Sequence, residues 1–549
     1  MMDFTRYVAT RLRRLVTPQS LPIPGSAQVP NSAGGYAWPL DRWDRLDRFL
    51  VLGSEGGTFY VGERELTVEN ARGAAECIAE DGPRTVHRVV EVSTSGRAPK
   101  NDPALFVLAM AAGLGDEDTR RAALLALPRV ARTGTHLFHW LRYVQAFRGW
   151  GRGVRRAVAE WYTAKPPREL AYQLLKYPSR DGWSHRDALR LAHPRPDTAE
   201  QGLLFRRVAT RATGEVPPEL EGSETVGLLR AVDELHGGEP TPARAAELVR
   251  EHRLTREMLP TELLRSAGVW EALLEEMPLT ALVRNLGVMS AVGLLAPGSG
   301  AARTVVARLS DREALRRARV HPVAVLAALK TYGRGRGTRG KGSWTPVPQV
   351  VDALDAAFYL SFGAVRPSRR RMLLALDVSG SMDAPVLGME GLSCREGAAA
   401  MALVTAAVEP EHRFVAFTSG SYPSMHAGYS TGLTPLSISP RQRMDDVVRS
   451  ISGLPFGGTD CALPMLEATK GRWKVDTFVV YTDNETWAGS VHPAQALREY
   501  RERTGIPAKL VVVGMASSGF TIADPEDAGM LDVVGFDASA PQLISDFAR

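Results

Sequence analysis

The sequence predicts a mainly α protein with a smaller α/β domain at its C-terminus. At 549 residues the chain is too long for one hydrophobic core, so two or more domains are expected. From residue 36 to about residue 365, apolar residues recur at spacings of three and four, which is typical of helices. After residue 366, apolar strand-like runs alternate with helical stretches, which predicts a doubly wound, mostly parallel sheet.

Residues 1–35 are predicted to form an extended N-terminal arm, because residues 20–35 are rich in Pro, Gly and Ser. The first 16 residues carry four arginines but lack the continuous apolar core of a secretory signal. No apolar run approaches the roughly 18 residues that would suggest a membrane span. The three cysteines lie far apart and give no disulfide framework. We therefore expect a cytoplasmic protein without a membrane partner.

Residues 36–365 are predicted to form successive short helices. Helical periodicity is clear over residues 103–110, 119–130, 136–147 and 151–162, and we expect each helix to carry charges opposite its apolar face. Gly and Pro between these stretches predict helices of about three to four turns joined by short loops. Successive helices of this size, without strand signals, predict a stacked array of the HEAT-repeat kind.

Residues 366–549 are predicted to form the α/β domain, with strands over residues 372–376, 414–417, 478–481 and 510–513. Helical patterns occupy the stretches between the strands. In such folds, ligands bind beyond the carboxyl ends of the strands. Polar residues directly after these strands are therefore the first candidates for a functional site.

The first of these strands ends in the sequence Asp377-Val378-Ser379-Gly380-Ser381. One carboxylate and two hydroxyls on a tight turn suit a hard divalent cation, most simply Mg²⁺, rather than zinc or copper. Thr459 lies on a glycine-rich turn just ahead of a helix, and Asp483 follows the next strand. We predict that Ser379 and Ser381 bind the cation directly, and that Asp377, Thr459 and Asp483 bind it directly or through water.

An isolated Asp-x-Ser-x-Ser turn can also be a turn with capped backbone groups, but the Thr and Asp loops follow it in the order that a cation site requires. The three loops together are the pattern of a von Willebrand factor A-like domain with a metal-ion-dependent adhesion site, a class that binds partners and rarely catalyses. Ser379 lacks the G-x-S-x-G elbow of a hydrolase, and no downstream His is evidently placed as its base. We therefore expect no enzymatic activity.

Charge is divided unevenly along the chain. Residues 1–365 hold 50 Lys and Arg against 40 Asp and Glu, whereas residues 366–549 hold 17 against 21. A basic first part suggests a polyanionic partner. Between Leu141 and Arg195 the chain has twelve Lys and Arg but only four Asp and Glu, and we call this stretch the basic segment. Aromatic residues are interleaved with these charges, among them Tyr143, Trp150, Tyr177 and Trp183.

The basic segment could neutralise phosphates and stack unpaired bases. A set of solvated helix faces whose aromatic residues belong to the core fits its composition equally well. His185 and His193, taken singly, are of a kind more often structural than functional. A second basic stretch at residues 333–341 could contact RNA or serve as a connection.

Several long strings of this sequence resemble the Ro autoantigen family, whose helical part is called the TROVE module. The strings lie at residues 47–58, 176–185, 276–287, 353–359 and 484–493. They are long and idiosyncratic, so chance is a poor explanation for the match. The lack of low-complexity tails and the Arg- and Ala-rich composition suggest a bacterial member.

The resemblance implies a HEAT-repeat ring, which we expect to be monomeric, closed by the von Willebrand A-like domain. It implies that small Y RNAs bind the basic outer surface and that single-stranded 3′ ends of misfolded or structured RNAs enter a central hole. In bacterial relatives the Y RNA is understood to tether the ring to the exonuclease polynucleotide phosphorylase. The family's RNA-contacting residues map onto Lys176, Arg180 and His193. Arg190 lies in the same motif, and Arg284 is a candidate phosphate ligand inside the ring, with burial in the core almost as strong an expectation.

Two functions stay open at this point. One is an RNA-binding ring that acts in RNA quality control, and the other is a metal-dependent protein-binding scaffold in which RNA is incidental. Residues 200–250 match the family only loosely. Residues 418–443 form a long loop near the expected metal site, so the partner of that site is left open.

Overall fold

A computed structural model describes most of the chain: residues 16–53, 71–210, 216–238, 240–337, 342–362, 365–386, 392–419, 432–440, 442–452, 454, 457–516 and 518–549. Four predicted features lie partly outside these residues: the arm at residues 1–15, the first family string at 54–58, the second basic stretch at 338–341 and the long loop at 420–431 and 441. Within the described ranges no helix is long and apolar enough to cross a membrane.

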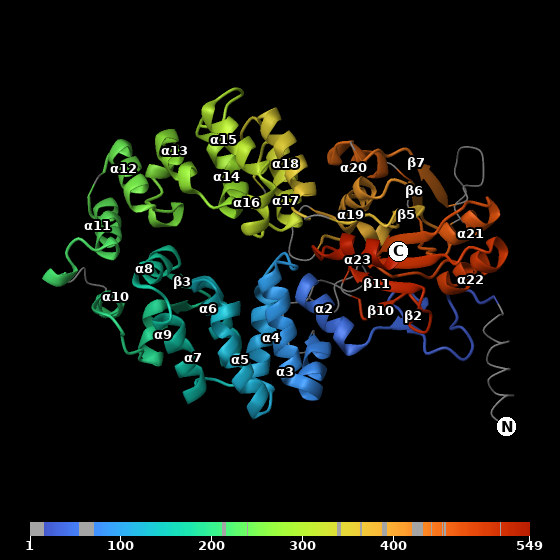
Figure 1. The fold of residues 1–549 in the computed structure, drawn as a ribbon, viewed down its shortest axis with the longest axis horizontal. Coiled ribbons are helices and arrows are strands. Elements are labelled where there is room, and N and C mark those ends of the chain that lie inside the picture. The colour runs from blue at the N-terminus through green and yellow to red at the C-terminus, as the bar shows by residue number, and fades with distance from the viewer. Residues whose placement is uncertain are drawn as a thin grey trace.

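Helices and α/β domain together form a ring, in which a curved helical array runs from one side of the domain round to the other (Figure 1). The helices of the array are α2 (Arg42–Leu52), α3 (Arg72–Ser95), α4 (Asp102–Leu114), α5 (Glu117–Val130), α6 (Gly134–Phe147), α7 (Arg152–Thr163), α8 (Pro167–Lys176), α9 (His185–Ala192), α10 (Ala199–Thr210), α11 (Glu224–Gly237), α12 (Pro242–His252), α13 (Ala267–Glu276), α14 (Leu279–Ala291), α15 (Gly300–Leu309), α16 (Arg312–Arg317), α17 (Pro322–Gly333) and α18 (Pro348–Leu360). Short 3₁₀ turns lie at Pro218–Leu220, Arg256–Met258 and Leu263–Arg265.

The four helices predicted from periodicity are confirmed as α4 to α7. Their starts follow from capping: the Asp116 carboxylate accepts a hydrogen bond from the Thr119 amide at 2.8 Å, and the Thr133 hydroxyl accepts one from the His136 amide at 3.2 Å. One expectation was wrong. Helix α4 has no charged face, because it is buried from Pro103 to Ala112 between α3, α5 and α6.

The α/β domain contains a six-stranded sheet in the order β11-β9-β8-β5-β6-β7, parallel except for β7. Its strands are β5 (Met372–Asp377), β6 (His412–Phe417), β7 (Leu433–Leu436), β8 (Thr477–Thr482), β9 (Lys509–Gly514) and β11 (Met530–Val534). Its helices are the 3₁₀ turn Gly380–Asp383, α19 (Cys394–Val408), α20 (Met444–Ser452), α21 (Leu463–Lys470), α22 (Pro493–Thr504) and α23 (Ala540–Ala548).

The four predicted strands are confirmed as β5, β6, β8 and β9. The sequence did not reveal the two edge strands, and the expectation of one long loop over residues 418–443 was wrong at residues 433–436, which form β7. Strand β7 carries Pro435, which sheets tolerate at an edge, and β11 carries Asp532 in its centre, so neither has a continuous apolar run.

The described part of the N-terminal arm packs against the α/β domain rather than the helices. Strand β2 (Tyr36–Pro39) pairs antiparallel with β1 (Val29–Pro30) and with β10 (Phe520–Thr521). Trp38 and Ile23 are buried in the core that covers one face of the large sheet. Residues 36–39, which the composition groups with the helical module, therefore belong spatially with the C-terminal domain, because their pairing partner lies far away along the chain.

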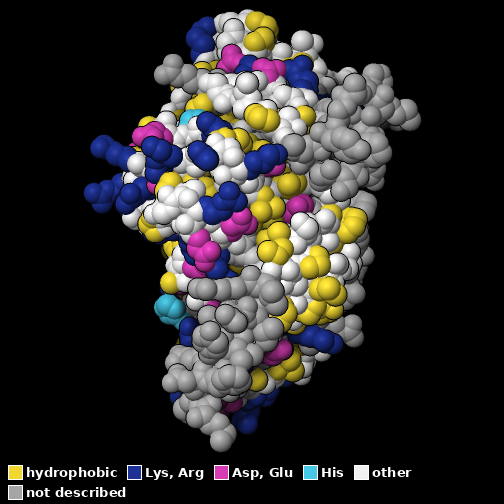
Figure 2. Space-filling model, turned by 90° about the vertical axis from the view of Figure 1, so that its right-hand side faces the viewer, with side chains coloured by type: hydrophobic (Ala, Val, Ile, Leu, Met, Phe, Trp, Pro, Cys, Tyr) yellow, Lys and Arg dark blue, Asp and Glu magenta, His cyan; other side chains and the backbone are white. Residues whose placement is uncertain are grey.

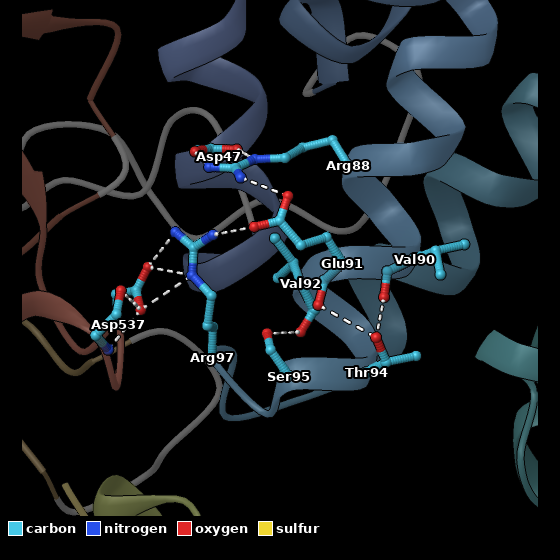
Figure 3. A network of polar contacts seen from close by, with 10 residues as sticks. Asp47, Arg88, Val90, Glu91, Val92, Thr94, Ser95, Arg97 and Asp537 are labelled. Carbon is cyan, nitrogen blue, oxygen red and sulfur yellow. Dashed lines mark hydrogen bonds and ion pairs between the residues drawn. The ribbon is translucent and has the colours of Figure 1, made fainter. Parts of the chain in front are cut away.

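Buried ion pairs join the ring at the α/β domain. Arg48 of α2 is 1% exposed and donates two hydrogen bonds of 2.7 Å to Asp532 of β11. Arg97, just after α3, donates to Asp537 at 2.6 Å and lies between that residue and Glu91 (Figure 3). The Arg97 carbonyl also accepts a hydrogen bond of 3.0 Å from Nε2 of His321, which caps α17. The first and last parts of the helical array thus contact each other as well as the domain.

Candidate metal centre and nucleic-acid interface

The Asp377 loop is held in one conformation by its own hydrogen bonds. Strand β5 lies in the middle of the sheet and ends at Asp377, which is fully buried. The Ser379 amide donates to one carboxylate oxygen at 2.9 Å, and the Thr482 hydroxyl donates to the other at 2.7 Å. The Ser379 and Ser381 hydroxyl oxygens are 3.0 Å apart, so both face the same point.

Asp483 and Thr459 reach the same edge from two other loops. Asp483 follows β8, the neighbour of β5, and its Oδ1 accepts a hydrogen bond of 3.1 Å from the Glu485 amide. The Thr459 carbonyl accepts hydrogen bonds of 3.1 Å from the Trp487 and Ala488 amides, which ties the two loops together. The structure therefore brings all five predicted ligand residues to one side of the sheet, which we call the metal edge.

The metal edge has the buried, unsatisfied oxygens that a cation would need. Asp483 and Thr459 are each 1% exposed. Neither Oδ2 of Asp483 nor Oγ1 of Thr459 has a hydrogen-bond partner among the described residues. Such atoms are costly to bury without a ligand. The described ranges contain no group of three or more His, Cys, Asp and Glu side chains placed to hold a metal, so a centre here would depend on the Ser and Thr hydroxyls.

Electrostatics at the metal edge also favour a cation. Burial raises the pKa of Asp377, and burial together with the negative charge of Asp377 raises the pKa of Asp483 to about 7. Arg395 of α19 is 4% exposed and donates to the carbonyls of Val378 and Ser379 at 3.1 and 3.2 Å, so it supports the backbone of the loop. A divalent ion between the two carboxylates would remove their repulsion. The residues present fit such an ion.

Several residues that shape the metal edge were missed in the sequence. Thr482 and Glu485 flank Asp483 in one short string, and that adjacency was the available signal. Arg395 carried no signal, since only the fold brings α19 under the Asp377 loop. Asn484 adopts a positive φ of 67°, which turns the chain sharply after the metal-edge aspartate.

Lys176 and Arg180 are the first two residues of the candidate RNA site along the chain. Lys176 ends α8 and its side chain is only 12% exposed, because its Nζ donates to the Tyr172 hydroxyl at 2.9 Å and lies 4.0 Å from Glu257. Arg180 lies on the two-stranded hairpin of β3 (Ser179–Arg180) and β4 (Trp183–Ser184), with its side chain 62% exposed. The Lys176 ammonium group is therefore held in place by its neighbours, whereas the Arg180 guanidinium group is largely open to solvent.

Arg190 and His193 continue the site at the end of α9, and both are exposed. His193 has a φ of 49° and caps the helix with its amide, which donates to the Leu189 carbonyl at 2.9 Å. Arg284 does not join this group. It is exposed on α14, on the opposite arc of the ring (Figure 1), so the alternative that it is buried in the core was wrong, and its role as a phosphate ligand stays a prediction.

The other conspicuous residues of the basic segment divide between core and surface. His185 is 2% exposed, its Nδ1 lies 2.7 Å from the Tyr162 hydroxyl, and burial lowers its pKa to about 4, which marks a structural histidine. Trp150 and Trp183 are half-buried and stack on each other with ring centroids 5.7 Å apart. The α/β domain differs in charge from the basic segment: on the face of the domain seen in Figure 2, Lys and Arg are mixed with Asp and Glu.

Comparisons with known proteins agree along nearly the whole chain. Residues 29–331 match the family model of the TROVE domain, and residues 371–548 match that of the Ro60 vWA domain. The RNA-binding protein RO60 of Deinococcus radiodurans is 44% identical over 526 residues, which cover 95% of each chain. The RNA-binding protein RO60 of Caenorhabditis elegans is 35% identical, over 96% of this chain and 91% of its own. The crystal structure of the Deinococcus radiodurans RO (RSR) protein superposes with a TM-score of 0.70 at 43% identity, over 93% of this chain and 99% of that one.

Proposed function

Because this chain belongs to the Ro family of RNA-binding proteins, we propose that it is a non-enzymatic RNA-binding ring that acts in RNA quality control. In this proposal, a small structured Y RNA binds the basic segment. The observation that carries it is the placement of Arg180, Arg190 and His193, which are exposed on consecutive elements of one short stretch. Lys176 adds a charge whose direction is fixed by Tyr172, so less side-chain freedom is lost when a phosphate binds.

The second RNA mode in the proposal is the capture of single-stranded 3′ ends by the centre of the ring. The ring arrangement supports it, since the buried pairs of Arg48 with Asp532 and Arg97 with Asp537 hold the circle closed. A strand would then have to enter by its end rather than from the side. Arg284, exposed on α14, is a candidate phosphate contact for this mode.

The α/β domain would hold Mg²⁺ at the metal edge and use it to bind a partner. Asp377, Ser379, Ser381, Thr459 and Asp483 are the residues that would hold the ion, and a bound cation would supply an open position for one oxygen of a partner. The exonuclease, a polynucleotide phosphorylase, would be tethered through the Y RNA, as the family resemblance implies.

A metal-dependent protein-binding scaffold is the second candidate function. The exposure of Trp487 favours it, since this large aromatic side chain is 41% exposed in the loop that carries Asp483. Aromatic residues in the open are enriched where proteins bind one another. In this reading the basic segment would bind RNA without selecting it.

Sequencing the RNA that co-purifies with the full chain distinguishes the two candidates. The proposed function predicts strong enrichment of one small structured RNA over total cellular RNA, and its loss from a Lys176→Ala, Arg180→Ala variant purified alongside. RNA that mirrors the cellular pool in both preparations would contradict Y RNA binding and favour the scaffold.

The second RNA mode has its own test. A linear RNA with a single-stranded 3′ tail should bind, whereas the same sequence closed into a circle should not. Equal binding of the two forms would exclude entry by the end.

A further inference from the structure

The strongest unexplained feature of the molecule is a fully buried glutamine from the N-terminal arm that lies beside the metal edge, against the residues that follow Thr459 and Asp483. Gln19 is 0% exposed, and its side-chain amide lies between the loop of Thr459 and the loop that follows Asp483. Arms of this composition usually lie on the surface with their polar side chains in water. A buried amide with every hydrogen-bonding group used is therefore a specific contact.

Gln19 bonds to both loops at once. Its Nε2 donates to Oδ1 of Asp460 at 2.7 Å, next to Thr459, and to the Val491 carbonyl at 2.8 Å. Its Oε1 accepts from the Thr486 hydroxyl and from the Gly489 amide, the latter at 3.2 Å. One side chain thus bridges the loop before α21 and the loop after β8.

The backbone of Gln19 is held just as firmly as its side chain. Its amide donates to the Gly489 carbonyl at 2.9 Å, and its carbonyl accepts from the Tyr36 amide at 2.9 Å. A Cβ at Gly489 would collide with Nε2 of the Gln19 side chain, so the two segments are in direct contact.

The rest of the arm adds three contacts to the loop after β8. Nδ2 of Asn31 donates to the Thr486 carbonyl at 2.7 Å, and the Ala33 amide donates to Oε2 of the buried Glu485 at 3.0 Å. A Cβ at Gly35 would collide with the Thr486 carbonyl and lie 2.9 Å from Cα of Trp487. The arm therefore forms one wall of the loop that carries Asp483.

The far end of the arm leads directly into the ring. From the end of the arm at Gly35 the chain runs through β2 to Asp41, which caps α2, and α2 carries Arg48. A Cβ on Gly514 would lie 2.9 Å from the Arg48 guanidinium and 3.3 Å from the Asn484 side chain. The pair of Arg48 and Asp532, which joins the helical array to the α/β domain and which we call the ring joint, is therefore close to Asn484, the residue after Asp483. The arm and the joint approach the metal edge from two sides.

From these contacts we infer that the N-terminal arm is a structural part of the metal centre, with Gln19 as a positioning residue that holds the Thr459 and Asp483 loops together. Binding of a divalent cation and docking of the arm are then coupled, and each strengthens the other by the same factor. This inference rests on the proposed cation site.

The first test measures Mg²⁺ and Mn²⁺ affinity of the full chain by calorimetry. Gln19→Ala should weaken binding at least about fivefold, the lower end of typical coupling between sites. Gly35→Ala should act in the same direction, since it displaces the arm without removing a polar group. Gln201→Ala is the matched control, because Gln201 is also a buried glutamine, 2% exposed, but donates to the Thr163 and Lys165 carbonyls in the helical array, so this variant should bind the cation normally.

The second test needs no variant. Hydrogen exchange of the wild-type Gln19 and Tyr36 amides should slow when Mg²⁺ is added, because the cation holds the arm in place. Wild-type affinity in both Gln19→Ala and Gly35→Ala, or exchange that Mg²⁺ leaves unchanged, would overturn the coupling. Failure of the wild-type chain to bind either cation would overturn the metal site itself, which is a separate result from normal binding by the variants.

Discussion

The metal edge and the basic segment place their functional side chains in opposite ways. The metal edge gathers five residues from three loops that are far apart in the chain, and each is at most 3% exposed. The basic segment presents Arg180, Arg190 and His193 from neighbouring elements, all open to solvent. The first region depends on the whole domain, and the second depends on one hairpin and the helices beside it.

The difference follows from the two kinds of ligand. A divalent cation needs several oxygens at fixed positions and short range, which only a rigid buried site supplies. A polyanion responds to charge over a longer range and exchanges its counterions, so exposed side chains on a modest scaffold are sufficient. Changes to the fold should therefore affect the metal edge more than the basic segment, and changes of salt should do the reverse.

Breaking the ring joint should have the largest effect. Arg48→Ala removes a buried guanidinium and leaves Asp532, whose side chain is 14% exposed, without its partner, which should lower the free energy of unfolding by about 3–5 kcal/mol. The exposed pair of Arg250 with Glu275 provides the control, and Arg250→Ala should cost no more than about 1 kcal/mol. Urea unfolding of the full chains gives both values. Similar losses in the two variants would mean that the joint does not support the fold.

Removing one metal-edge carboxylate should separate the two regions cleanly. Asp483→Asn should weaken Mg²⁺ binding more than about 100-fold, beyond what loss of an outer partner usually costs, and leave RNA affinity unchanged. Asp476→Asn is the matched control, since Asp476 pairs with Arg371 next to the start of β8, away from the metal edge. Calorimetry with Mg²⁺ and filter binding with Y RNA measure the two effects. A parallel loss of RNA binding in Asp483→Asn would contradict the independence of the regions.

Neutralising the basic segment should give a smaller and salt-dependent effect. Lys176→Ala with Arg180→Ala should weaken Y RNA binding about tenfold at low salt and reduce the slope of log K against log salt by about 2. Arg316→Ala with Arg317→Ala removes two exposed charges from α16 and should change neither value. If affinity and slope stay at wild-type values in the first variant, the RNA site lies elsewhere.

Lowering the pH should reduce the free energy of unfolding by a still smaller amount, because of His321. Burial lowers its pKa to about 4, so the folded state keeps it neutral while the unfolded state takes up a proton near pH 6.5. Stability from this residue is therefore present above about pH 6.5 and is lost as pH falls toward 4. Between pH 7.5 and pH 6 the loss should be about 0.8 kcal/mol. His321→Gln should remove that part of the pH dependence, whereas His193→Gln, at an exposed position, should not.

The two regions also differed in how far the sequence could predict them. The metal-edge ligands followed from strand ends and residue chemistry, because the carboxyl ends of parallel strands must share an edge. The residues of the RNA interface came from the family resemblance, since a basic composition alone did not distinguish a binding face from a solvated one. The arm could not be placed at all, because no local pattern shows that Gln19 lies beside Asp460.

By itself the sequence determined the helical array, four strands of the large sheet and the turn Asp377-Val378-Ser379-Gly380-Ser381. These features depend on periodicity, capping and residue type, which act over a few neighbouring residues. Only the tertiary structure decided that α4 is buried, that the arm enters the metal edge and that Arg48 and Arg97 close the ring. Those features join segments distant in the chain, and their stability comes from buried polar contacts that exist only after the chain has folded.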